Sequence, residues 1–199
     1  MVADLNRLER QMRFIVKIDR LKQVIRQSAL VDGSRQENDA EHSWHIAVMA
    51  FLLAGYANSD VDILKVLKMT LIHDLVEIYA GDTFAYDEVN AKTQNDREAK
   101  AANRIFSILP EDQREELHSL WKEFDSKSTP EARFAVAIDK LQPLILSYNN
   151  RGWSWERHGV VRSQIVEEKR CIEEGSKKLW EVAQELIEAS VSGGFLEDK

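Results

Sequence analysis

The most informative residues of this 199-residue chain are an adjacent histidine and aspartate, His73 and Asp74, inside an apolar segment. Burying a carboxylate beside an imidazole is costly unless something compensates the charge, and a bound cation is a common compensation. Both groups are frequent ligands of divalent metals. On one helix Glu77 would share their face, and Asp82 follows shortly after. A salt-bridged surface strip is the alternative, but it fits poorly with the flanking residues Leu71, Ile72, Leu75, Val76 and Ile78.

Two more candidate ligands lie far from this pair in the sequence. His42 precedes it, and Asp139 lies in a later apolar run. His45, one helical turn after His42, is a weaker candidate, because a lone histidine on an apolar helix is more often a core or surface residue. Asp139 has the alternative of pairing with a neighbouring basic residue. Pro143 cannot donate a hydrogen bond to the carbonyl of residue 139, so a kink is expected near this candidate ligand.

Helices are the elements expected to position these residues. Apolar side chains recur every three or four positions in nearly every segment, and sustained strand alternation is missing. The spacing predicts helices over residues 5–25, 39–57, 61–80, 96–109, 111–124, 130–148 and 162–189. We expect Asp39 to cap the second helix and Gly81 to end the third, a turn at 31–34, and a break at Gly175 in the last.

These elements predict an all-α fold: a bundle of about six to eight helices in a single domain over residues 1–199. Its core is expected over about 21–189, followed by a loose C-terminal tail over about 192–199. Trp153 and Trp155 are expected in a loop, where they would cap a substrate, meet a partner subunit or, as the favoured interpretation, pack against the core.

Composition excludes several classes of function. The net charge is -7 without a basic block, which argues against a nucleic-acid partner but allows a small phosphorylated substrate. The longest apolar stretch, 46–57, is too short to span a membrane, so no membrane partner is expected. The single cysteine, Cys171, forbids an internal disulfide and fits a cytoplasmic location.

The order of these candidate residues resembles a known family. The segments 37–43, 71–82, 137–143 and 153–160 are similar to those of the HD-domain metal-dependent phosphohydrolases, closest to the 5′-deoxynucleotidase-like branch of small HD proteins. The resemblance implies an all-α HD-domain bundle around one divalent metal ion. The ligands that it implies are His42, His73, Asp74 and Asp139, and the catalytic acids that it implies are Glu77 and Asp82.

Two arginines are candidates for binding substrate phosphate. Arg26 and Arg35 flank the turn before His42, and a guanidinium group can bind phosphate in a bidentate way. In the family's nucleotidase branch an arginine before the first histidine contacts phosphate, and Arg26 is the match. In the bacterial nucleotidases a tryptophan follows that arginine, whereas Gln27 follows here, which predicts weaker discrimination of the sugar.

The favoured function is hydrolysis of (deoxy)nucleoside 5′-monophosphates to nucleoside and phosphate, with Mn, Co, Mg, Zn or Fe as the metal. Hydrolysis of another small phosphate ester or of a nucleoside triphosphate is the enzymatic alternative. A regulatory module that binds metal or nucleotide without turnover is the non-enzymatic alternative. Related small HD proteins pair, so a homodimer is expected.

Overall fold

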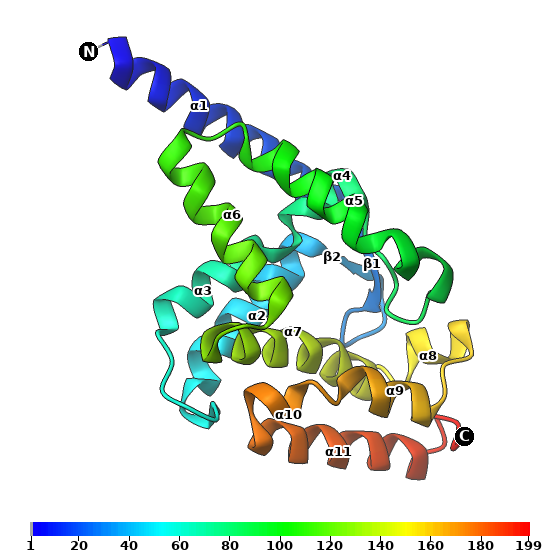
Figure 1. Cartoon of the computed structure of the whole chain (residues 1–199). Helices are drawn as coiled ribbons and strands as arrows, with labels where there is room; N and C mark the ends of the chain where they lie inside the picture. Colours follow the sequence, from blue (N-terminus) through cyan, green and yellow to red (C-terminus); the bar gives the residue numbers. More distant parts are fainter. Residues whose placement is uncertain (1) are drawn as a thin grey trace.

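The computed structural model describes residues 2–199, including the side chains of residues 5–87, 90 and 92–199, and it confirms the all-α class (Figure 1). The described residues form seven helices of ten or more residues: α1 Val2–Ile18, α2 Asp39–Leu53, α3 Ile63–Ile72, α5 Glu88–Phe106, α6 Glu111–Ser126, α7 Pro130–Asn149 and α11 Lys177–Ser192. Shorter helices are α4 Glu77–Ala80, α8 Trp153–His158, α9 Arg162–Lys169 and α10 Ile172–Gly175. The expected helix 96–109 therefore begins earlier, at Glu88.

A short β-hairpin interrupts the N-terminal helical region. The expected helix over 5–25 ends at Ile18 and continues as a 3-10 turn, Asp19–Gln23. β1 Ile25–Ala29 then pairs antiparallel with β2 Gln36–Asn38 around the expected turn. Strands this short show no readable alternation, so the periodicity of the sequence did not predict them.

The cap of α2 is Asn38, not Asp39 as expected. The Asn38 side chain accepts a hydrogen bond from the Glu41 N–H, and the Glu41 carboxylate accepts one from the Asn38 N–H. This reciprocal capping box satisfies two backbone donors at the helix start. It also frees the Asp39 side chain, which is fully buried, to face the interior.

The helix expected over 61–80 is divided at its chemically important residues. Asp62 caps α3 by accepting hydrogen bonds from the Leu64 and Lys65 N–H groups. After Ile72 the chain tightens into a 3-10 turn, His73–Val76, before α4 begins. Gly81 ends α4 with φ of 76°, as expected, because a positive φ is readily adopted only by glycine. The 3-10 turn buries all four of its side chains.

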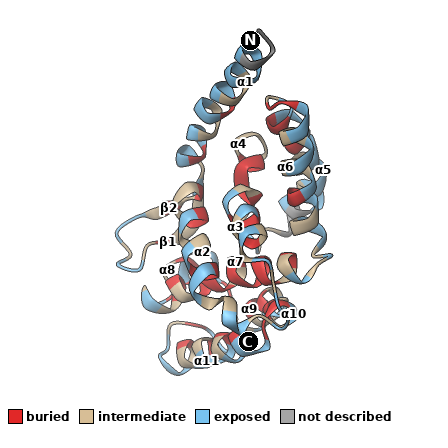
Figure 2. Cartoon of the chain, turned by 90° about the vertical axis from the view of Figure 1, so that its left-hand side faces the viewer, coloured by how far each residue is buried: buried red, intermediate tan, exposed pale blue. Residues whose placement is uncertain are grey.

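The core surrounds α7, which lies among α2, α3, α10 and α11 (Figures 1 and 2). α7 continues as one helix through Pro143, and most of the side chains of α7 are buried. A main apolar cluster packs α7 against the helices of the C-terminal half, and a second cluster lies under α1 and α5. The carboxylate of Asp139 is therefore presented from the most buried helix of the fold.

The C-terminal region differs from expectation at two places. Trp153 and Trp155 lie in α8 rather than in a loop, and Trp155 packs in the main core. The tail after α11 is packed rather than loose. Its Glu197 carbonyl accepts a hydrogen bond from the Arg162 N–H, and Leu196 is buried. The break at Gly175 is present, between α10 and α11.

Gly175 is required by the close approach of α10 to α7. A Cβ at this position would lie 2.2 Å from the Arg133 carbonyl oxygen and 2.7 Å from the Ala137 Cβ. We expect Gly175→Ala to destabilise the fold by about 1–3 kcal/mol, because the helices must separate. Thermal unfolding measures this as a lower Tm.

The matched control is Gly55→Ala, since a Cβ at Gly55 would meet nothing within 4 Å. Its Tm should be unchanged or slightly raised. Equal effects of the two substitutions would contradict the packing argument.

Candidate active site

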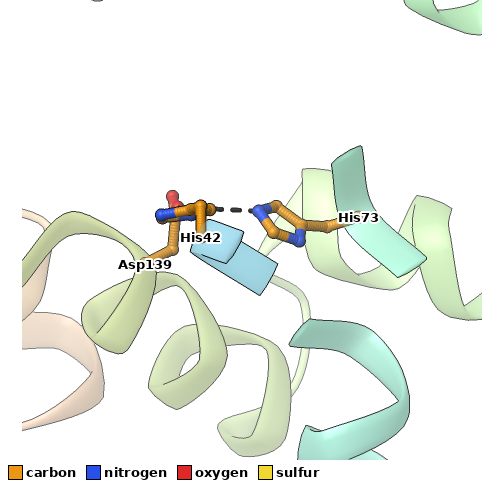
Figure 3. A group of neighbouring side chains, drawn as sticks. All are labelled: His42, His73 and Asp139. Carbon is orange, nitrogen blue, oxygen red and sulfur yellow. Dashed lines mark hydrogen bonds and ion pairs between the residues drawn. The ribbon is translucent and has the colours of Figure 1, made fainter. Parts of the chain in front are cut away.

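The four expected metal ligands converge from α2, the 3-10 turn and α7. His42 Nε2 lies 2.9 Å from Asp139 Oδ1, and His73 Nε2 lies 3.6 Å from the same oxygen. Asp74 completes the group, with Oδ1 at 3.0 Å from His73 Nε2 and Oδ2 at 3.9 Å from His42 Nε2. Figure 3 shows the two rings and the Asp139 carboxylate pointing toward one another. Ligand atoms of His42, His73 and Asp139 all lie within 4.8 Å of one another, close enough for one ion.

The hydrogen bonds behind the histidines fix which nitrogen faces the cluster. Gln142 Nε2 donates to Glu37 Oε2 at 2.9 Å, so Gln142 Oε1 is the atom that accepts from His42 Nδ1 at 3.1 Å. His73 Nδ1 donates to the Thr70 carbonyl at 3.0 Å. With Nδ1 protonated in both rings, each Nε2 keeps a lone pair for a metal, as second-shell partners of metal-binding histidines commonly ensure.

The charges of this cluster suit a cation. The Nε2 atom of His73 is buried without a hydrogen-bond partner, although carboxylate oxygens surround it. Burial lowers the pKa of His73, but Asp74 and Asp139 outweigh it and raise the pKa to about 10. Burial raises the pKa of Asp74, yet His73 and Arg26 lower it to about 2. The donor set thus attracts a positive charge, which a proton or a divalent metal can supply.

A second group of acids lies beside the first. Ligand atoms of Asp39, Glu77 and Asp82 are within 4.8 Å of one another. Burial and the nearby Asp74 raise the pKa of Asp39 to about 7, and burial with Asp74 and Asp39 raises the pKa of Glu77 well above its usual value. Burial also raises the pKa of Asp82, against the opposing effect of Arg26. Carboxyl groups that retain protons near neutral pH can serve as general acids.

Arg26 connects the two acidic groups. Its Nη1 donates to Asp74 Oδ2 at 2.9 Å and to Asp39 Oδ1 at 3.3 Å, and its Nε lies 3.7 Å from Glu37 Oε1. Burial lowers the pKa of Arg26, but the surrounding acids, led by Asp74 and Glu77, raise it overall. Arg26 is therefore a positively charged group that its hydrogen bonds to Asp74 and Asp39 hold in place.

Sequence reasoning missed Asp39, Glu37 and Gln142. The sequence predicts Asp39 only as a helix cap. The signal for another role is Asn38, which directly precedes Asp39 and is the better cap. Glu37 and Gln142 act through contacts between residues about a hundred positions apart, which no local pattern shows. His45 is not part of the cluster, because its Nδ1 contacts Gln142 Nε2 at 3.1 Å.

Arg35 lies outside the site at which substrate phosphate is expected to bind. Its guanidinium forms a bidentate pair with the Glu41 carboxylate, at 2.8 and 2.7 Å, on the exposed side of the hairpin. It is not among the described residues that line the cavity at the site. The expectation that Arg35 binds substrate therefore does not fit the structure, because the guanidinium of Arg35 already pairs with the Glu41 carboxylate.

The site opens into a cavity of about 460 Å³, a size typical of small-molecule sites. Both expected catalytic acids, Arg26 and three of the expected ligands line one end of it: Glu77, Asp82, Arg26, His73, Asp74 and Asp139. The lining also includes aromatic and neutral polar side chains, among them Phe84, Tyr86, Trp155, Gln27 and Ser154.

Comparison with known proteins agrees with this geometry. A family model described as HD domain matches residues 18–180. The chain belongs to the HD-domain family. A solved structure of a predicted metal-dependent phosphohydrolase from Magnetospirillum magnetotacticum superposes on this HD protein with a TM-score of 0.93, at 50% identity and 96% coverage of both chains. A conserved hypothetical protein from Pyrococcus furiosus gives a TM-score of 0.65 at 25% identity, over 88% of this chain and 98% of that one.

Curated relatives have a more specific name. Human 5′-deoxynucleotidase HDDC2 is 29% identical over 136 residues, and Schizosaccharomyces pombe 5′-deoxynucleotidase hdd1 is 28% identical over 134 residues. These matches cover 67% and 65% of this chain, and 65% and 66% of the relatives' own lengths. In the described part of the chain no helix combines the length and apolar character that crossing a membrane requires.

The hydrogen bond from His42 to Gln142 yields a testable prediction. Gln142→Leu removes the acceptor that keeps His42 Nδ1 protonated, so we expect affinity for Mn²⁺ or Co²⁺ to fall by about 10–100-fold. Calorimetric titration of metal-free protein measures this.

Gln94→Leu is the control, because it makes the same substitution at a glutamine of the cavity lining that donates to Glu98 and contacts no histidine. Unchanged affinity in Gln142→Leu, or an equal loss in both variants, would show that the histidine orientation does not depend on Gln142.

Proposed function

We propose that this HD-domain protein is a metal-dependent phosphohydrolase that converts (deoxy)nucleoside 5′-monophosphates to nucleoside and phosphate. The observation that supports it most is the convergence of two histidines and two aspartates beside Arg26 and a separate carboxyl group, all at one end of a cavity. The curated relatives named 5′-deoxynucleotidase support the same class of substrate.

The proposed ligands of the divalent ion are His42, His73, Asp74 and Asp139. The unpartnered His73 Nε2 and the acidic donors fit such an ion, with Mn, Co, Mg, Zn and Fe all compatible with two imidazoles and two carboxylates. When bound, the ion would polarise phosphate oxygens and make a water more acidic.

The protein's own groups then account for binding and proton transfer. Arg26 neutralises phosphate oxygens, since it is charged and fixed at the same end of the cavity. Glu77 and Asp82 divide the proton transfers between them. One accepts a proton from the attacking water, and the other donates a proton to the leaving 5′-oxygen. Asp39 contacts Arg26, and we propose that it positions this cation.

The local charge favours a monophosphate. The basic side chains that line the cavity are Arg26, Lys127, Lys140 and Lys169. Lys140 already contacts Glu168 at 3.1 Å and Asp139 at 3.7 Å, and Lys169 contacts Glu168 at 2.7 Å. A single terminal phosphate needs few cations, whereas the longer polyphosphate of a triphosphate would approach additional carboxylates such as Glu98 and Asp125. Net charge of -7 also disfavours polyanions at longer range.

Phosphate release over a nucleotide panel, with added Mn²⁺, Co²⁺ or Mg²⁺, tests the proposal. We expect 5′-monophosphates to be hydrolysed faster than triphosphates, 3′-phosphates or cyclic nucleotides. Gln27 predicts that ribo- and deoxynucleotides differ little. A triphosphate or cyclic nucleotide as the best substrate would contradict the charge argument, and a strict deoxy preference would contradict the Gln27 argument alone.

Variants in the same assay separate metal binding from proton transfer. Glu77→Gln and Asp82→Asn should keep metal affinity but lose about 10²–10⁴-fold in rate. Asp74→Ala should lose metal and activity together. If the first two variants remain fully active, a binding module without turnover becomes the better interpretation.

We also propose that the protein forms a homodimer. Large apolar side chains are exposed along one stripe of α1 (Leu5, Leu8, Met12, Ile15 and Val16) and one of α2 (Trp44, Val48, Phe51 and Leu52). Figure 2 shows α1 extending beyond the other helices. The chain exposes 10838 Å², whereas a compact monomer of 22.9 kDa exposes about 9,600 Å². The excess is comparable with the ~800 Å² that each partner buries in a standard interface.

Light scattering at micromolar concentration should give twice the chain mass, and Phe51→Glu should shift the mass toward that of one chain. Val31→Glu, which replaces an exposed apolar residue of the hairpin, is the control and should stay dimeric. A monomer mass for the unchanged protein would reject the dimer. A cytoplasmic location is likewise a proposal, supported by the single free cysteine, Cys171.

A further inference from the structure

Part of the cavity lining is aromatic, and the proposed hydrolysis does not use it. After Gly81 the chain runs along the cavity and places Phe84 and Tyr86 in its wall. Their rings meet edge to face, with centroids 5.2 Å apart, and the Phe84 ring lies 4.4 Å from the His158 ring. Phe84 and Tyr86 form an aromatic wall of the cavity, and the exposed His158, from a segment about seventy residues later, packs against Phe84 without lining the cavity.

A polar group adjoins this wall. Gln27 Oε1 lies 3.2 Å from His158 Nε2 and 3.5 Å from Gln36 Nε2. In the described part of the chain both side-chain contacts of Gln27 use Oε1, so the two hydrogens on its Nε2 are left for a ligand. An aromatic wall with an amide donor at its edge matches a flat heteroaromatic ring that has hydrogen-bond acceptors on its rim.

The sequence positions of these residues limit the distance between the acidic and the aromatic parts of the lining. Phe84 is two residues after Asp82, and Gln27 directly follows Arg26. Two residues of chain span at most about 7 Å, a separation that a sugar between a phosphate and a base can bridge. Both parts line the cavity of about 460 Å³.

We propose that the aromatic wall, formed by Phe84 and Tyr86, binds the base of the substrate, with Gln27 as a hydrogen-bond donor to an acceptor atom on the base edge. This inference rests on the proposed function, because it names the part of the same cavity that selects nucleotides from other phosphate monoesters. Stacking accepts every base, since each has a π-face. The site therefore requires a base and discriminates little among bases.

The test compares a deoxynucleoside 5′-monophosphate with deoxyribose 5-phosphate, which has the same sugar and phosphate without the base. With Mn²⁺-loaded enzyme, kcat/KM should be higher for the nucleotide. Phe84→Ala should raise the KM of the nucleotide by between about 5- and 150-fold and leave deoxyribose 5-phosphate unchanged. Phe84→Trp should preserve the preference, and Tyr56→Leu, which alters an exposed aromatic residue outside the cavity lining, is the control.

Two outcomes would overturn the inference. One is equal kcat/KM of the unchanged enzyme for both substrates. The other is an equal loss for both substrates in Phe84→Ala, which would show that the wall only supports Asp82. A titration with free nucleoside separates this inference from the proposed function. If no monoester is hydrolysed, the proposed function fails, and nucleoside binding that Phe84→Ala weakens would still support the base site. Absence of nucleoside binding would then reject it.

Discussion

Uncompensated negative charge in the interior is the constraint on which this structure depends. Five carboxyl groups around the two histidines are buried, namely Glu37, Asp39, Asp74, Glu77 and Asp139, and half-buried Asp82 adjoins them. Within the described residues, Arg26 and Lys140 are the basic side chains that contact them. Burying like charges is unfavourable, so the folded state must take up protons or a cation. The raised pKa values of Asp39 and Glu77 mean that these carboxyl groups take up protons readily, which lowers the negative charge. A bound metal ion would compensate the charge in place of these protons.

The backbone serves this constraint by changing its helical geometry where the charges gather. A continuous α-helix over 61–80 would have advanced 100° per residue through His73, Asp74 and Glu77. The 3-10 turn, which contains His73 and Asp74, instead ends before Glu77, where α4 begins. The same residues thus supply one carboxylate to the histidine cluster and another to the second acidic group. A local tightening of the helix separates the two functions.

Much of this arrangement could be predicted from the sequence, and the failures have physical causes. His73, Asp74 and Asp139 are candidates because isolated polar residues in apolar helical runs are conspicuous. The resemblance to the HD family adds His42, and the structure brings the four together. The hairpin, the 3-10 turn and α8 were not predicted, because elements of three to six residues have no readable period. Two further features depend on which of several neighbouring polar groups forms a given hydrogen bond: the burial of Asp39 next to the cap Asn38, and the ion pair of Arg35 with Glu41. Composition and spacing do not predict the outcome of such competition.

Neighbouring residues in the sequence contribute to both the acidic and the aromatic parts of the cavity. Arg26 and Gln27 are consecutive, with the first among the acids and the second beside His158. Asp82 and Phe84 are likewise two residues apart on one segment. A change at Gln27 or Phe84 alters the proposed base site while the buried contacts of Arg26 with Asp74 and Asp39 remain fixed by α2 and the 3-10 turn. The proposed phosphate site is therefore constrained by charge, whereas the proposed base site is constrained only by shape and stacking and can change independently.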